Sequence, residues 1–193
     1  EMVCGIDLVK WQIKIANGEH LDFTQKDIKQ RGHAIECRIY AEDPSRNFLP
    51  TPGLVRKLVL PEGPGIRNDV GIIEGQEVTS AYDPLLAKLV VWDSTRLDSI
   101  NKMDYALSNF VILGLITNQP FLREIMQDSV YRKASFSTKY IEEYFSDWEL
   151  EVALPEAFAA GLLSNQVSQT GSVSKHSDSS FSPWHKSNWR QSF

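Results

Sequence analysis

The stretch Gly32-His-Ala-Ile-Glu-Cys-Arg-Ile-Tyr-Ala41 alternates between two kinds of side chain. Apolar residues stand at every second position, namely Ile35, Cys37 and Ile39. Two charged residues, Glu36 and Arg38, stand between them. Alternation with a period of two is typical of a β-strand that has one buried face. The pattern therefore predicts a strand over residues 32–41 that turns one face toward a core.

The residues before this strand have the spacing of a helix. Apolar side chains recur three or four positions apart, at Ile6, Val9, Ile13 and Ala16. Asp7 is a plausible N-cap for this run, and Gly18 is a plausible stop. We therefore expect a helix from about residue 7 to residue 17.

After the strand, the chain changes between loop-like and strand-like segments. Residues 47–53, Asn-Phe-Leu-Pro-Thr-Pro-Gly, contain two prolines that lack an N–H donor, so we expect a loop. Three short β-like runs follow, at residues 54–60, 65–73 and 76–79, with Gly- and Pro-rich turns between them. They predict a small antiparallel meander. The apolar run Leu85–Trp92 is broken by one lysine and predicts a buried strand.

Beyond residue 93 the apolar spacing becomes helical. Side chains three or four positions apart predict an amphipathic helix, and they are Leu97, Ile100, Met103, Leu107 and Phe110. Ser94 or Thr95 can cap its start, and we expect its end near Gly114. Two shorter helices are predicted at Gln119–Gln127 and Thr138–Phe145. The order of helix, sheet and helices predicts an α+β fold, in which helices flank a small antiparallel sheet.

The composition excludes several classes of protein. Hydrophobic residues make up 42% and charged residues 23% of the 193 residues, which is typical of a globular chain and not of a disordered or collagen-like one. The net charge of −5 argues against a nucleic-acid surface. The first residues lack a signal-peptide pattern, and no apolar run approaches the roughly 18 residues of a membrane span. We expect neither secretion, nor a membrane, nor a nucleic-acid partner.

The two cysteines, Cys4 and Cys37, form no C-x-x-C pair and have no histidine at ligand spacing. This usage indicates neither a disulfide framework nor a zinc site, so we expect no bound metal and a reducing compartment.

The last quarter of the chain differs from the rest in composition. Ten serines fall between Ser164 and Phe193, and apolar periodicity is weak there. This predicts a flexible Ser-rich linker over residues 148–193, although residues 153–163 could form one short helix. The chain also begins without Met, directly before a helical pattern, which suggests a piece of a longer protein.

Few residues stand out as candidates for a catalytic or binding role. The loop Pro61-Glu-Gly-Pro-Gly-Ile-Arg67 places a guanidinium beside glycines, where it could bind a carboxylate, a phosphate or a developing oxyanion. The alternative is an ordinary surface arginine on a hairpin. Glu36 and Arg38 could be an acid–base pair, although a solvated ion pair is the commoner use of such a face. His33 has no partner in a recognisable triad, and it points away from Glu36 on a strand.

Several blocks, in order, resemble the C-terminal lobe of biotin carboxylases. The longest is Arg31-Gly-His-Ala-Ile-Glu-Cys-Arg-Ile-Tyr-Ala-Glu-Asp-Pro44, followed by Phe48-Leu-Pro-Thr-Pro-Gly53 and Ala81-Tyr-Asp-Pro-Leu-Leu-Ala-Lys-Leu89. The start, Glu1-Met-Val-Cys-Gly-Ile-Asp-Leu-Val9, resembles the stretch that closes the family's ATP-grasp part. Further stretches resemble the biotin-containing subunit of acyl-CoA carboxylases of the methylcrotonyl-CoA type, and next the propionyl-CoA type. The resemblance implies three parts: residues 1–30 end the ATP-grasp region, 31–147 form the C-terminal domain, and 148–193 link onward.

The resemblance implies ATP-dependent carboxylation of biotin, a ligase reaction that uses bicarbonate. Arg67 matches the arginine of the family's GxGxR loop, which contacts the ureido oxygen of biotin and bicarbonate. Thr138 matches a position at the adenine edge of the nucleotide, although it could instead be an N-cap. Trp92 and Arg96 match a corner that family members use for dimerisation.

The implied cofactors are ATP and magnesium, together with biotin on a carrier domain outside this chain. The implied partners are the rest of the biotin carboxylase domain, the carrier domain, a second copy in a homodimer and a carboxyltransferase subunit, in the cytoplasm or the mitochondrial matrix. The family's ATP-binding residues do not appear in this sequence, so the resemblance implies that the chain alone is inactive. Two alternatives stay open: a non-catalytic dimerisation or docking module, and an unrelated α+β enzyme that uses His33 with Glu36.

Overall fold

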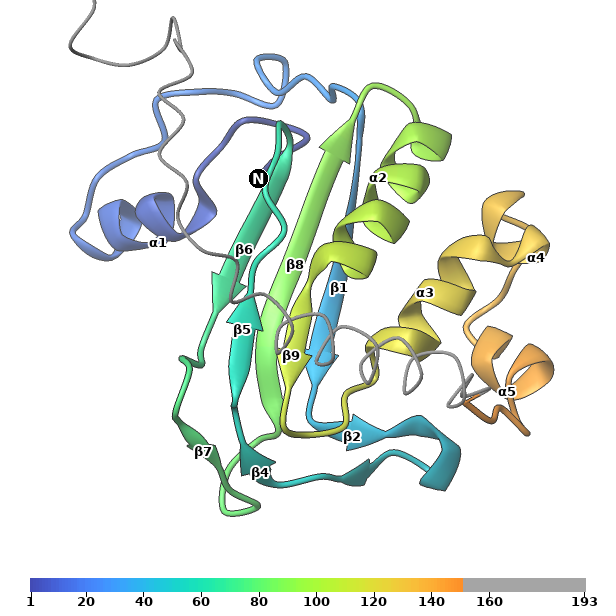
Figure 1. The fold of residues 1–193 in the computed structure, drawn as a ribbon. Coiled ribbons are helices and arrows are strands. Elements are labelled where there is room, and N and C mark those ends of the chain that lie inside the picture. The colour runs from blue at the N-terminus through green and yellow to red at the C-terminus, as the bar shows by residue number, and fades with distance from the viewer. Residues whose placement is uncertain (151–193) are drawn as a thin grey trace, which may run out of the picture. The chain divides into compact units, whose positions relative to one another are not determined.

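The computed structural model describes residues 1–150, and its centre is a three-stranded antiparallel sheet. The strands lie in the order β1 (His33–Tyr40), β8 (Leu85–Asp93) and β6 (Ile66–Val70), as Figure 1 shows. β8 pairs with a neighbour on each side, which explains its nearly continuous apolar sequence. The strands predicted at residues 32–41 and 85–92 are confirmed.

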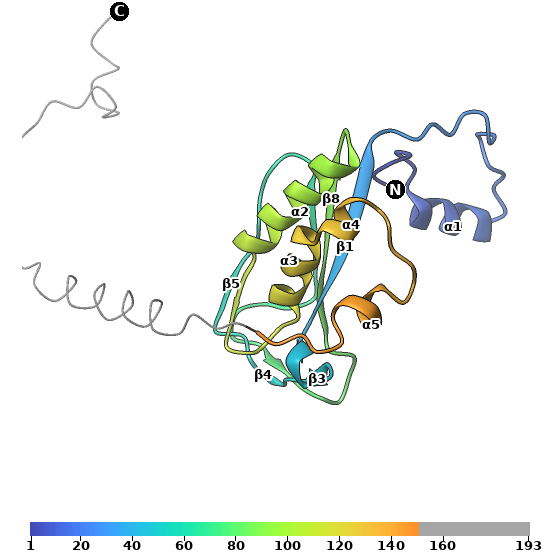
Figure 2. The same ribbon diagram turned by 90° about the vertical axis from the view of Figure 1, so that its right-hand side faces the viewer.

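Two helices cover one face of this sheet. They are α2 (Arg96–Asn109) and α3 (Gln119–Gln127), and Figure 2 shows them on one side of β1 and β8, with α1 (Leu8–Ala16) on the other. The fully buried side chains between sheet and helices include Ile39, Leu89, Val91, Ile100, Met103 and Leu107. Each such side chain contributes about 1.5–3 kcal/mol through burial. The opposite face of the sheet, called the open face below, carries the alternate, charged residues of β1, β6 and β8.

The long helix α2 begins as predicted but ends earlier. Thr95 is its N-cap, because the Thr95 hydroxyl oxygen accepts from the backbone N–H of Asp98. The helix ends at Asn109 and does not continue toward Gly114. The next residues form β9 (Val111–Leu113), which pairs with β5 (Lys57–Val59). The side-chain amide of Gln119 donates to the carbonyls of Leu107 and Phe110, so the last turn of α2 finds a donor from outside the helix.

The short strands are present, but the predicted meander is wrong. β4 (Gly53–Leu54) pairs with β7 (Glu77–Val78), whereas β5 pairs with β9, and β6 pairs with β8. Each run therefore finds its partner far along the chain and not in the next run. The expected loop at 47–53 also contains a strand, β3 (Leu49–Pro50), which pairs with β2 (Glu42–Asp43). A two-residue pairing at a sheet edge tolerates proline because a ladder bond can be omitted there.

The remaining helices are short. α1 begins after Asp7, whose carboxylate accepts from the backbone N–H of Lys10, as predicted. α3 spans the predicted residues, whereas α5 (Tyr140–Tyr144) is shorter than predicted. α4 (Ser129–Arg132) was not predicted, and Asp128 caps it. Within residues 1–150, no helix is long and apolar enough to cross a lipid bilayer.

The first compact unit of the chain is Glu1–Leu150. The linker predicted over 148–193, and the short helix considered within it, lie outside the described residues from 151 onward.

Candidate functional site

Arg67 lies on strand β6, just after the Gly- and Pro-rich turn, and its side chain is on the open face of the sheet. The register of the three strands places Glu36, Val90 and Arg67 in one row across this face. The Arg67 side chain is 47% exposed. The guanidinium is therefore accessible, while its backbone is held in the central sheet.

The turn before Arg67 is fastened to its surroundings at three points. The carbonyl of Gly65 accepts from the backbone N–H of Trp92 over 2.8 Å. The Nζ of Lys102 donates to the carbonyls of Pro64 and Trp92, at 3.1 and 3.0 Å. The side-chain amide of Asn68 donates to the carbonyl of Pro61 over 2.8 Å. These bonds fix the position from which Arg67 projects.

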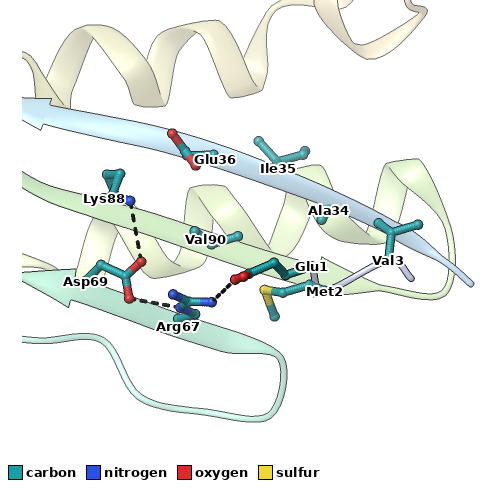
Figure 3. A pocket seen from close by; sticks show the side chains of 10 residues that line it. All are labelled: Glu1, Met2, Val3, Ala34, Ile35, Glu36, Arg67, Asp69, Lys88 and Val90. Carbon is teal, nitrogen blue, oxygen red and sulfur yellow. Dashed lines mark hydrogen bonds and ion pairs between the residues drawn. The ribbon is translucent and has the colours of Figure 1, made fainter. Parts of the chain in front are cut away.

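The charged groups around Arg67 form a chain of alternating sign, which Figure 3 shows. The Nε of Arg67 donates to Oδ1 of Asp69 over 2.9 Å, and its Nη1 donates to Oε2 of Glu1 over 2.8 Å. The Nζ of Lys88 lies 3.7 Å from Oδ2 of Asp69. The hydrogen bond from Nε of Arg67 is the main cause that lowers the pKa of Asp69. The hydrogen bond from Nη1 is the main cause that lowers the pKa of Glu1. Both carboxylates in turn raise the pKa of Arg67, Asp69 more than Glu1.

A pocket of about 270 Å³ opens beside this chain of charges. It is lined by the first three residues and by β1, β6 and β8: Glu1, Met2, Val3, Ala34, Ile35, Glu36, Arg67, Asp69, Lys88 and Val90. Small apolar side chains lie next to two cations there. Three carboxylates, those of Glu1, Glu36 and Asp69, also line the pocket. The guanidinium of Arg67 can still donate a charge-assisted hydrogen bond to an electron-rich oxygen of a ligand there.

Thr138 lies in the exposed turn before α5, and the interpretation of Thr138 as an N-cap is wrong. The N-cap of α5 is Lys139, and it makes no capping bond with its side chain. The hydroxyl oxygen of Ser137 instead accepts from the backbone N–H of Lys139 over 3.1 Å. In Figure 1, α5 lies beyond β1, on the side of the sheet away from β6. The structure therefore does not bring Thr138 together with Arg67.

Trp92 and Arg96, at the corner between β8 and α2, are both engaged within the chain. Trp92 is half-buried, and its indole N–H donates to the carbonyl of Arg31 over 2.8 Å. Arg96 donates from Nη1 and Nη2 to the carbonyls of Arg132 and Tyr131, at 2.8 and 2.6 Å. Its guanidinium carbon also lies 5.0 Å from the centre of the Tyr131 ring. Arg96 thus fastens α2 to the end of α4, a role that the sequence did not indicate.

The other candidate residues, Glu36, Arg38 and His33, lie on β1 and do not form a catalytic group. Glu36 and Arg38 form an exposed ion pair with 3.1 Å between Oε1 and Nε, as the solvated interpretation of this strand face predicts. Glu36 also lines the pocket. His33 is exposed at the start of β1, three positions from Glu36, so the two side chains leave opposite faces of the strand. The geometry gives no support to an enzyme that uses His33 with Glu36.

Sequence reasoning missed Asp69, Lys88 and Glu1 as neighbours of Arg67. A signal for Asp69 was present, because residues two apart on a strand share a face. Lys88 was visible as the single charge within an apolar strand. The contact with Glu1 spans 66 positions and left no signal in the sequence.

Comparisons with known proteins agree with this architecture. The family model of the biotin carboxylase C-terminal domain matches residues 36–143. A pyruvate carboxylase subunit of Methanothermobacter thermautotrophicus is 46% identical over 144 residues, which cover 75% of this chain and 29% of that protein. The alpha subunit of the mitochondrial methylcrotonoyl-CoA carboxylase of Rattus norvegicus is 37% identical over 197 residues, which cover 99% of this chain and 28% of that protein.

A solved structure has the same fold. It is the biotin carboxylase domain dimer of Hydrogenobacter thermophilus 2-oxoglutarate carboxylase, in complex with MgADP, ADP and bicarbonate. The TM-score is 0.76 at 41% identity, and the match covers 79% of this chain and 34% of that chain. The predicted α+β class is confirmed, and this chain spans between 28% and 34% of the length of these three relatives. On the family match and the shared fold, the chain belongs to the biotin carboxylase C-terminal domain family.

Proposed function

We propose that this chain supplies the biotin-facing arginine of an ATP-dependent biotin carboxylase. The observation that carries the proposal is the placement of Arg67. Its half-exposed guanidinium projects from strand β6 into a pocket on the open face, directly after a turn that is fastened at three points. The position also matches the arginine of the family's GxGxR loop. In the proposed reaction, biotin is carboxylated at the expense of ATP, with bicarbonate as the source of the carboxyl group.

The chemistry suits a guanidinium. Biotin supplies a cyclic urea whose nitrogen takes up the carboxyl group and whose oxygen becomes more negative as that nitrogen loses its proton. Arg67 keeps its positive charge throughout, because a guanidinium does not lose its proton in a protein at ordinary pH. Asp69 and Glu1 raise the pKa of this guanidinium further. A fixed cation aimed at an oxygen that gains charge lowers the barrier by up to about 3–4 kcal/mol. Arg67 takes no proton in this role; it orients the urea and stabilises the charge.

The remaining assignments follow from the family. We propose that residues 1–30 end the ATP-grasp region and that Thr138 contacts the adenine edge of the nucleotide. Among residues 1–150, no group of three acidic, histidine or cysteine side chains could hold a metal ion. We assign the magnesium ligands to the rest of the biotin carboxylase domain.

The partners in the proposal are a biotin carrier domain, a second copy of the carboxylase that meets this one near Trp92 and Arg96, and a carboxyltransferase subunit. A relative with 41% identity is a dimer, which supports the second of these. The match to the alpha subunit of methylcrotonoyl-CoA carboxylase runs through 99% of this chain, which favours an acyl-CoA carboxylase as the parent enzyme, in the cytoplasm or the mitochondrial matrix.

The test is Arg67→Ala in the parent carboxylase. We expect carboxyl transfer to biotin to fall by about 10²–10³-fold, as for the loss of an oxyanion donor. The KM for ATP should change less than about twofold, because Arg67 is not assigned to the nucleotide. The matched control is Arg123→Ala, which removes another ion-paired arginine with 40% side-chain exposure from helix α3.

Two outcomes would contradict the proposal. Equal losses in biotin and ATP kinetics would make Arg67 a structural residue. Kinetics like those of Arg123→Ala would make Arg67 incidental and would favour the interpretation of this lobe as a non-catalytic docking or dimerisation module.

A further inference from the structure

Asp69 stands between two cations and gives one carboxylate oxygen to each. It follows Arg67 by two positions on β6, so the two side chains share the open face. Its Oδ1 accepts from Nε of Arg67 over 2.9 Å. Its register partner on β8 is Lys88, whose Nζ lies 3.7 Å from Oδ2. Arg38, next along the same row, is paired with Glu36 and does not compete for Asp69.

The bond to Asp69 decides which edge of the guanidinium faces the pocket. A guanidinium has five N–H donors in a rigid plane, and the Nε–H of Arg67 is the one nearest its own strand. Asp69 occupies that donor, and Glu1 occupies one donor on Nη1. Within residues 1–150, Nη2 makes no hydrogen bond to the protein. The Nη2 side is therefore the part of the fork left for a ligand.

An arginine that is 47% exposed would otherwise rotate among many conformers. Asp69 opposes this because it is on the same rigid strand, whereas Glu1 belongs to the segment before α1. Sites held by strands are more accurately oriented than sites held by loops. The hydrogen bond from Arg67 also lowers the pKa of Asp69, so the carboxylate stays ionised at neutral pH.

We propose that Asp69 is a positioning residue, which holds the guanidinium of Arg67 by its Nε and turns the Nη2 edge toward the biotin pocket. Lys88 supports Asp69 from the neighbouring strand by attracting its second oxygen. The inference rests on the proposed function of Arg67 and adds the residues that orient it. No direct contact between Asp69 and a ligand is part of it.

The first experiment compares Asp69→Ala with Asp104→Ala in the parent carboxylase. Asp104 is a close match, since it accepts from Nε of Arg123 over 3.1 Å and its side chain is 30% exposed, against 31% for Asp69. We expect kcat/KM for biotin to fall by about 10–100-fold in Asp69→Ala only, because misaligned groups lose rate steeply. The KM for ATP and the melting temperature should be the same in the two variants.

The second experiment is a double-mutant cycle. If Asp69 acts through Arg67, the variant with both Arg67→Ala and Asp69→Ala should be within about twofold of Arg67→Ala alone. Lys88→Met should lose several-fold in kcat/KM for biotin, and Lys88→Arg should restore most of it. Losses that multiply in the double variant would overturn the inference, because Asp69 would then act independently of Arg67.

The outcomes separate the two proposals. Suppose that Arg67→Ala loses most of kcat/KM for biotin, while Asp69→Ala keeps the same kcat/KM as Asp104→Ala. This result would overturn the positioning role of Asp69 and leave the proposed function of Arg67 intact. A silent Arg67→Ala would overturn the proposed function, and the positioning role with it.

Discussion

Gly65 and Trp92 meet backbone to backbone. The N–H of Trp92 donates to the carbonyl of Gly65, and a Cβ placed on Gly65 would lie 2.5 Å from the carbonyl oxygen of Trp92. Gly65 also has a φ of +75°, which side chains rarely adopt. This contact aligns the turn before Arg67 with the end of β8.

Replacing Gly65 with alanine should therefore destabilise the chain more than the same change at Gly75. Gly75 has a similar φ of +81° but has no atom within 4 Å of the added Cβ. We expect about 1–2 kcal/mol of strain in both variants and a further loss of about 1–3 kcal/mol in Gly65→Ala from the backbone contact. Urea unfolding of the two variants measures the difference. Equal losses would mean that the Gly65 contact relaxes freely.

Arg96→Ala should lower the stability of the monomer, whether or not this corner forms an interface. The substitution removes charge-assisted hydrogen bonds to the carbonyls of Tyr131 and Arg132, which predicts a loss of about 2 kcal/mol or more in the free energy of unfolding. Arg123→Ala, which breaks an exposed ion pair, should lose less than about 1 kcal/mol.

Thermal unfolding of the two variants checks this expectation. Sedimentation of the proposed carboxylase tests separately whether the corner is an interface. Trp92→Ala should produce monomers if the corner is an interface. If Arg96→Ala left the melting temperature of a monomeric sample unchanged, the hydrogen bonds from Arg96 to α4 would not contribute to stability.

Cys37 should be unreactive in the folded chain, whereas Cys4 should react. Burial, with a smaller effect of the nearby Glu36 charge, raises the pKa of the Cys37 thiol from its ordinary value of 9.0 to about 12. Cys4 is only partly buried. Alkylation at pH 8, followed by mass spectrometry, should label Cys4 alone, and Cys4→Ser should abolish labelling until urea is added. Rapid labelling of Cys37 without denaturant would show that the sheet opens locally.

The raised pKa of Cys37 also makes the free energy of unfolding depend on pH in the alkaline range. The folded pKa of Cys37 is above the unfolded value, so its contribution is fully present below about pH 9 and is lost as the pH rises toward about 12. The urea midpoint of the unsubstituted chain should fall over this pH range. The urea midpoint of Cys37→Ala should fall less steeply. Parallel pH profiles for the two chains would contradict the assignment.

Two leucines of α2 should respond very differently to truncation. Leu107 is fully buried against the sheet, whereas Leu97 is 50% exposed on the same helix. Leu107→Ala should lower the free energy of unfolding by about 2–5 kcal/mol, because it leaves a cavity. Leu97→Ala should change it by about 0.5 kcal/mol. Denaturant titration of both variants measures the contrast, which would vanish if α2 were not packed on β1 and β8.

Local patterns were enough for the elements with strong periodicity. The strands β1 and β8, the helices α1 and α3 and the start of α2 could all be predicted, because their apolar spacing and their caps depend on neighbouring residues. Arg67 could be chosen as the candidate residue from its Gly-rich turn and from the resemblance to a family. The weak points were the short strands, where two or three residues give no usable period.

The sequence by itself determined the α+β class, the family and the one arginine worth testing. Only the tertiary structure decided that β5 pairs with β9 and β6 with β8, that Arg96 fastens α4, and that Glu1 holds Arg67. The physical reason is distance along the chain. Helical periods and caps are set within a few residues, whereas strand pairing and ion pairs between segments far apart in the sequence exist only after the core has brought those segments together.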